Sequence, residues 1–190
     1  MAAGMGVLTD YFRAPDAATV VRALELTGGG RPEFFSGGSR GGSNRGSART
    51  LDGAFDGAFD GVEAKRLDPG VVLAELVAAI RDEPWQVDLV VETPVWPTTP
   101  EPGPHRPDGP ADEDDPWTTG PWVTELDDAT RDTLALVPDE RVPEAAARWA
   151  QAEESGDADP CDLLLVAREL IGLARRARAA GERLYCWICL

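Results

Sequence analysis

The pattern of apolar and polar residues is most distinctive at the end of the chain. Residues 160–180 carry apolar side chains at helical spacing and run into Gly181, so they are predicted to form a long amphipathic helix that ends there. Residues 182–190 contain the sequence Arg-Leu-Tyr-Cys-Trp-Ile-Cys-Leu, in which both alternating sets of side chains are apolar. A strand of this kind is covered on both faces. The chain is therefore expected to end on a strand inserted into a sheet.

The N-terminal part of the chain predicts a strand followed by a helix. Residues 6–13 read as a first strand. Asp16 can accept hydrogen bonds from the free N–H groups of a first helical turn, and Val20 and Leu24 belong to an apolar stripe at helical spacing. Residues 28–30 are all glycine and are expected to end that helix.

The middle of the chain predicts a central helix and several shorter elements. The Asp-Pro pair at 68–69 is typical of a helix start, and the apolar residues that follow surround most of the helix before Pro84 ends it. Residues 87–92 form a short apolar run rich in β-branched side chains, which favours a strand. Residues 127–136 and 143–154 predict two short helices.

Together these elements predict the α+β fold class. We expect a single compact domain over residues 1–190, in which a small sheet that includes the N- and C-terminal strands is packed by about five helices. Two low-complexity inserts interrupt the pattern. Residues 36–50 are rich in Gly, Ser and Arg and offer little apolar area to offset the entropy of ordering, so they are expected to be flexible. Residues 97–121 are rich in proline and acidic residues.

Acidic residues give the chain a formal net charge of −16. Between residues 101 and 132, ten Asp and Glu stand against two arginines, which accounts for half of that charge. Such a segment is not expected to build a core. A net charge of this sign repels nucleic acid and anionic membranes and attracts basic proteins. The expected partner is therefore a basic protein, and neither nucleic acid nor a membrane is expected to bind. The alternative is that the charge only gives the protein a soluble surface with an acidic loop.

The same chain-wide features predict a cytoplasmic location. No apolar run approaches the roughly 20 residues that span a bilayer. The first residues, Met-Ala-Ala-Gly-Met-Gly, lack the basic start and apolar core of a signal peptide. The three cysteines are an odd number and suit reduced thiols.

Cysteine and histidine offer little for catalysis or metal binding. Cys186 and Cys189 have the spacing of a redox or zinc half-site, but residues three apart in a strand point to opposite faces. We interpret them as structural cysteines and expect no metal and no cofactor. His105 is the only histidine and lies among prolines in the acidic segment, which argues against a positioned general base.

Two groups of charged residues are candidates for binding. One lysine and three acids lead into the helix that starts at Asp68, where they could position a ligand. The alternative is a capped helix surrounded by ordinary surface ion pairs. The second group lies in the acidic segment and could contact a basic partner. The candidate residues are Asp60, Glu63, Lys65 and Asp68 in the first group, and Asp112, Glu113, Asp114 and Asp115 in the second.

The two ends of the chain share short patterns with a known family. Residues 5–12, Met-Gly-Val-Leu-Thr-Asp-Tyr-Phe, precede an Asp-capped helix, and residues 170–181, Leu-Ile-Gly-Leu-Ala-Arg-Arg-Ala-Arg-Ala-Ala-Gly, precede the last strand. Both patterns resemble the YfbM-like family of uncharacterised bacterial proteins, whereas the middle of the chain departs from it. The resemblance implies a small α+β domain of unassigned activity and transfers no site residues.

Two functions of different classes fit the sequence. The first is a small acidic interaction protein, such as an immunity protein, an antitoxin or a regulatory partner, that binds a basic protein. The second is a small-molecule-binding protein or an enzyme that uses the carboxylates near residues 60–68. The absence of a nucleophile–base pair favours the first.

Overall fold

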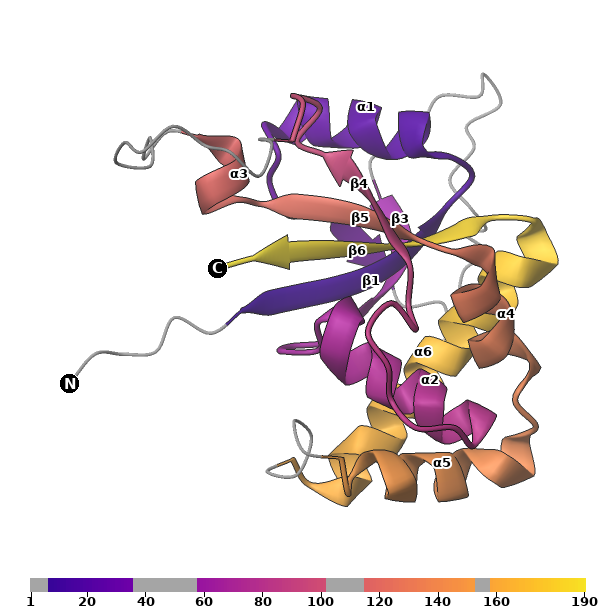
Figure 1. Ribbon diagram of the computed structural model, residues 1–190. Helices are drawn as coiled ribbons and strands as arrows, with labels where there is room; N and C mark the ends of the chain where they lie inside the picture. The colour runs from indigo at the N-terminus through magenta and orange to yellow at the C-terminus, as the bar shows by residue number, and fades with distance from the viewer. Residues whose placement is uncertain (1–6, 36–57, 102–114, 153–157) are drawn as a thin grey trace.

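The computed structural model describes residues 7–35, 58–101, 115–152 and 158–190 (Figure 1). The predicted flexible insert at 36–50, most of the predicted insert at 97–121, His105 and three of the candidate acids lie outside these residues. The three acids are Asp112, Glu113 and Asp114.

The described strands form one mixed six-stranded sheet in the order β2-β3-β1-β6-β5-β4. Neighbouring strands are antiparallel except for the parallel pair of β2 and β3. The predicted first strand at residues 6–13 is observed one or two residues later. The bounds are β1 Leu8–Ala14, β2 Glu33–Phe35, β3 Ala58–Glu63, β4 Glu92–Trp96, β5 Trp122–Leu126 and β6 Arg183–Cys189.

The last strand, β6, lies inside the sheet between β1 and β5, as the sequence predicts. Its alternating side chains enter two different cores. Leu184 and Cys186 pack on the side that carries most of the helices, whereas Tyr185 and Trp187 pack on the other side. Both faces of β6 are therefore covered, and its apolar sequence on both faces has a direct structural cause.

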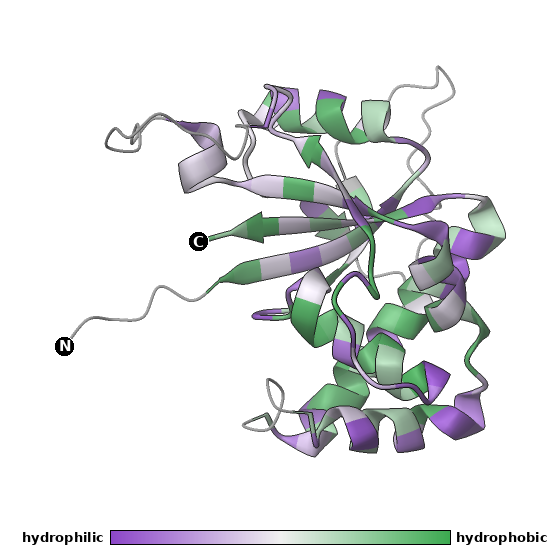
Figure 2. Ribbon diagram, in the orientation of Figure 1, coloured by the Kyte–Doolittle hydropathy of each residue, from purple (hydrophilic) through white to green (hydrophobic). Residues whose placement is uncertain are grey.

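Helices cover both faces of the sheet, which gives the α+β class that the sequence predicts (Figure 1). Helix α1 packs on one face, and α2, α4, α5 and α6 contribute to the core of the other. Figure 2 shows hydrophilic residues on the outer side of α5. No helix within the described ranges is both long and apolar enough to cross a membrane. The bounds are α1 Ala17–Thr27, α2 Ala74–Arg81, α3 Pro116–Thr119, α4 Asp128–Leu136, α5 Val142–Trp149 and α6 Pro160–Ala180, with a π-helical turn η1 at Pro69–Leu73 and a 3₁₀ turn η2 at Asp139–Arg141.

Two of the predicted helix starts are confirmed by their caps. The Asp16 carboxylate accepts a hydrogen bond from the Thr19 N–H at 2.7 Å, and the Asp68 carboxylate accepts one from the Val71 N–H at 2.8 Å. The helix after Asp68 begins differently from an ordinary α-helix, because the Leu73 N–H donates to the Asp68 carbonyl across five residues. The sequence therefore locates this start correctly but does not reveal its π-helical geometry.

Two expectations about the middle of the chain are wrong. The predicted strand at residues 87–92 is a series of turns and bends, and the strand begins only at Glu92. The acidic segment does contribute to the core, because β5 lies within it and buries Val123 and Leu126 completely. Strand β5 forms because β6 and β4 pair with it on either side, and a short local pattern carries no signal of such partners.

Candidate functional site

The structure divides the first predicted binding cluster between the two faces of the sheet. Asp60 and Glu63 lie three positions apart on β3, so their side chains point in opposite directions. Asp60 faces α6, where its partners are Arg13 and Arg176. Glu63 pairs with Arg31 at 3.0 Å on the other side. The sequence placed these two carboxylates in one site, and the structure does not bring them together.

Asp60 is a buried carboxylate held by two arginines. Arg176 of α6 donates two hydrogen bonds to it, at 2.6 and 2.9 Å, and Arg13 of β1 donates a third at 2.7 Å. Burial by itself raises the pKa of the Asp60 carboxyl, but the hydrogen bonds from Arg176 and Arg13 outweigh it, so the net pKa is lowered. This carboxylate ties β1, β3 and α6 together.

The other members of the first cluster lie at the end of β3 and the start of η1. Lys65 is exposed in the turn after β3, and Asp68 caps the π-helical turn. A further acid, Glu92 of β4, lies close enough to Asp68 to interact with it electrostatically and accepts a hydrogen bond from the Thr124 hydroxyl at 2.7 Å. Burial, followed by the charge of Asp68, raises the pKa of Glu92 above its ordinary value of 4.5. The sequence does not reveal Glu92 as a neighbour of Asp68, because the two residues approach each other only when β4 joins the sheet.

We expect Glu92→Gln to stabilise the protein at neutral pH. The folded state raises the pKa of this carboxyl, so its ionised form costs stability that the protonated form does not. The unfolding free energy of the wild type therefore falls as pH rises through the folded pKa, while that of the variant does not. Denaturant unfolding at pH 7 and at pH 4 measures the effect. If the variant gained as much free energy of unfolding at pH 4 as at pH 7, the ionised carboxylate would not be the cause, and this assignment would be contradicted. The hydrogen bond from Thr124 does not explain a difference between the two pH values, because the amide of the variant can accept it at either pH.

The one described acid of the second cluster, Asp115, has a local structural role. Its carboxylate accepts a hydrogen bond from the Trp117 N–H at 2.9 Å and caps the short helix α3. Farther along the acidic segment, several acids are paired with arginines. Glu125 pairs with Arg183, Asp128 with Arg131 at 2.8 Å, and Asp132 with Arg131 at 2.9 Å. This part of the acidic segment is thus largely neutralised by its own neighbours.

The cysteines of the last strand point to opposite faces, as predicted. Cys186 belongs to the core beneath α2, α4, α5 and α6, whereas Cys189 packs against the core beneath α1. Burial raises the pKa of the Cys186 thiol well above its ordinary value, which keeps it protonated and unreactive. In the part of the chain that the structure describes, no group of three or more His, Cys, Asp or Glu could hold a metal ion.

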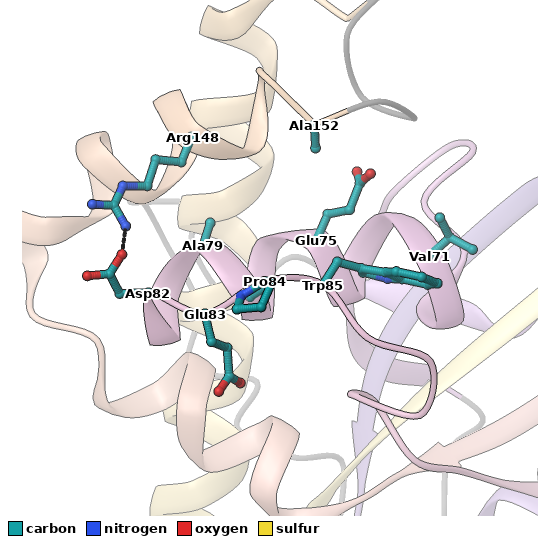
Figure 3. Close-up of a pocket in the computed structure, with 10 residues that line it drawn as sticks. Val71, Glu75, Ala79, Asp82, Glu83, Pro84, Trp85, Arg148 and Ala152 are labelled. Atoms are coloured by element: carbon teal, nitrogen blue, oxygen red, sulfur yellow. Dashed lines mark hydrogen bonds and ion pairs between the residues drawn. The ribbon is translucent and has the colours of Figure 1, made fainter.

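A pocket with a volume of about 730 Å³ lies between α2 and α5 (Figure 3). The segment that follows α2 closes its third side. Alanines and Val71 supply an apolar lining. Its polar or aromatic lining residues are Glu75, Asp82, Glu83, Trp85 and Arg148.

Local sequence explains why the pocket forms here. Helix α2 buries Leu76, Val77 and Ile80 in the core. The alanines that line the pocket have short side chains, which leave room for the pocket next to α5. Helix α5 is fixed by Trp149, which is fully buried and donates a hydrogen bond from its indole N–H to the Val72 carbonyl at 2.9 Å. Asp82 then ends α2 in the left-handed conformation, with φ of 59°, and directs the chain towards Trp85.

The pocket is acidic and has one aromatic wall. Glu75 comes from the first turn of α2 and is 8% exposed, so the residue is largely shielded from water. Trp85 is 43% exposed, and Figure 3 shows its indole in the span between Glu75 and Val71. Asp82 and Glu83 add two further negative charges. Among the described lining residues, Arg148 of α5 is the one cation, and it pairs with Asp82.

The pocket was not predicted from the sequence, although two features of the sequence indicate it. Glu75 is a single acid in the otherwise apolar run Val-Val-Leu-Ala-Glu-Leu-Val-Ala-Ala-Ile. Trp85 follows Pro84 in a polar turn, where a large apolar side chain has no obvious core to enter. The second feature is informative because the indole stays half-exposed in the folded protein.

The chain matches no protein-family model, no curated protein and no solved structure at a significant level. The resemblance of its ends to the YfbM-like family stays a prediction.

Proposed function

We propose that this protein binds a basic protein partner, and that the pocket between α2 and α5 receives an arginine or lysine side chain of that partner. The observation that carries the proposal is the presence of a buried carboxylate and a half-exposed indole in one pocket, Glu75 and Trp85. A carboxylate binds a cationic head group by charge-assisted hydrogen bonds, and an indole face attracts the same cation. The apolar lining suits the methylene stem of such a side chain.

The surface next to the pocket supports a protein as the source of the cation. After Trp85 the chain exposes two further apolar side chains, Val87 at 71% and Val91 at 51%. Half-exposed tryptophan beside apolar residues is characteristic of protein interfaces, where a few aromatic and arginine side chains contribute most of the affinity. The net charge of −16 would accelerate the encounter with a basic protein.

The two groups of charged residues predicted from the sequence are not the centre of this proposal. The first group has structural roles or lies apart from the pocket: ion pairs hold Asp60 and Glu63, Asp68 caps a helical turn, and Lys65 is exposed in a turn. We therefore do not propose that these residues bind the ligand. Contact of the partner with Asp112, Glu113, Asp114 and Asp115 stays a prediction. Binding of a free organic cation, in line with the small-molecule alternative, is an outcome of the test below.

We expect Glu75→Gln and Trp85→Ala to weaken the binding of an arginine-rich peptide about tenfold or more. The first variant removes a partly buried charge at nearly constant volume, and hydrogen bonds to charged groups contribute about 1.5–3 kcal/mol. The probe is a fluorescein-labelled peptide of arginine, glycine and serine, and its fluorescence anisotropy is measured at low and at physiological ionic strength. A peptide with citrulline in place of arginine keeps the shape without the charge and should not bind.

Two matched variants control for general effects. Glu169→Gln removes one negative charge from the exposed face of α6, and Trp117→Ala removes an indole at α3, both outside the lining of the pocket. Thermal unfolding checks that each variant folds. Undetectable binding of the peptide, or equal losses in the control variants, would contradict the proposal. Binding of free arginine or choline as tightly as the peptide would favour a small-molecule function instead.

A further inference from the structure

Arg148 closes the end of the pocket at which α2 stops. Its side chain extends from the last turn of α5 and pairs with the Asp82 carboxylate, as the dashed line in Figure 3 marks. A second nitrogen of the same guanidinium donates to Glu144 of α5 at 3.2 Å. Arg148 therefore bridges a carboxylate on each of the two helices that form the pocket.

Arg148 presents a guanidinium group to Asp82, and an arginine of the proposed partner would bring the same group. We infer that Arg148 is an internal competitor: it holds one oxygen of the Asp82 carboxylate in the free protein, and an arginine of the partner pairs with both oxygens of Asp82 only by taking its place. This inference rests on the proposed function and adds that Arg148 limits the affinity of the same pocket. Weakly basic ligands are thereby disfavoured, because they must displace a covalently tethered competitor.

The structure provides an alternative position for the displaced side chain. Glu144 lies four residues before Arg148 on α5 and already accepts one of its hydrogen bonds. The side chains of Arg148 and Asp82 are 42% and 66% exposed, and exposed ion pairs contribute little to stability. The exchange of one guanidinium for another at Asp82 therefore requires no rearrangement of the core.

The test removes the competitor and keeps its apolar stem. With the arginine peptide as probe, Arg148→Met is expected to tighten binding about three- to fivefold, because Asp82 becomes available without competition. Arg141→Met is the matched control: it removes the same charge from an exposed arginine at the other end of α5 and should tighten binding less than about twofold. Any general effect of net charge appears in both variants.

A double-mutant cycle ties the effect to Asp82. Asparagine tolerates the left-handed conformation of residue 82, so Asp82→Asn removes the charge with little strain. In that background Arg148→Met should leave the affinity unchanged. The inference is overturned if the wild type binds the peptide and Arg148→Met binds it no more tightly. It is also overturned if Arg148→Met still raises the affinity in the Asp82→Asn background. Either result leaves the proposed function standing. If the wild type does not bind the peptide, the proposed function fails and the inference fails with it.

Discussion

Removal of residues 185–190 is expected to leave a protein without a cooperative fold. These residues form most of β6, the strand that joins β1 on one side to β5 on the other. Tyr185 and Cys186 are completely buried and Trp187 is 4% exposed. Burial of each large apolar side chain contributes roughly 1.5–3 kcal/mol, and the lost ladder hydrogen bonds add to this. The sum is comparable with the whole stability of a typical domain, about 5–15 kcal/mol.

Near-ultraviolet circular dichroism and thermal unfolding measure this effect. The truncated chain should lose the signal of its packed aromatic residues and show no cooperative transition. Deletion of Leu190 alone is the control, since this residue is 54% exposed and follows the end of β6. A truncated protein with the melting temperature of the full chain would show that β6 is not an integral part of the sheet.

The parts of the fold that the sequence predicted are those whose signals are local. The last helix is observed at Pro160–Ala180, as expected, because apolar spacing and the terminal Gly181 both mark it in the sequence. Asp16 and Asp68 cap their helices through contacts with residues three positions later. Even the central position of β6 follows from its own residues, since a strand apolar on both faces must be covered on both.

The parts that the sequence did not predict depend on contacts between distant residues. Strand β5 is only five residues long and contains Thr124 and Glu125, so its own pattern resembles a polar loop. It becomes a strand because β6, about sixty positions later in the chain, pairs with it. The run at residues 87–92 illustrates the opposite error, because its β-branched residues have no strand partner and form turns and bends, in which Val90 is buried and Val87 and Val91 are exposed.

The candidate site shows the same division. Charged residues close together in the sequence suggested a cluster at residues 60–68, but the alternation of β3 separates Asp60 from Glu63. The acidic pocket instead combines Glu75 and Trp85 with Arg148, and this combination depends on how α5 packs against α2. A single acid inside an apolar helix and a tryptophan after a proline were the available signals, and neither specifies the position of α5.

Asp60→Asn is expected to lower the free energy of unfolding by about 3–5 kcal/mol. The substitution keeps the shape of the side chain but leaves Arg13 and Arg176 beside an uncharged amide, which cannot accept all three of their hydrogen bonds. Breaking a buried ion pair from one side is costly because the remaining charge loses its compensation. Arg13 keeps its ion pair with Glu182, so this loss falls mainly on Arg176. Glu63→Gln on the same strand is the matched control: its side chain is 61% exposed, so the change should cost less than about 1 kcal/mol.

The pH dependence of the wild type and the Asp60→Asn variant separates the charge of Asp60 from a simple packing defect. The folded state lowers the pKa of this carboxyl below its ordinary value of 3.8, so its contribution is present above that value and is lost as pH falls through the folded pKa. The amide of the variant does not titrate. Denaturant unfolding from pH 7 down to acid pH should therefore show a constant difference between the proteins near neutrality and a narrowing difference below about pH 4. A difference that persists unchanged in acid would contradict this assignment, because the two side chains have the same shape and the loss of stability in the variant would then not follow the charge of Asp60.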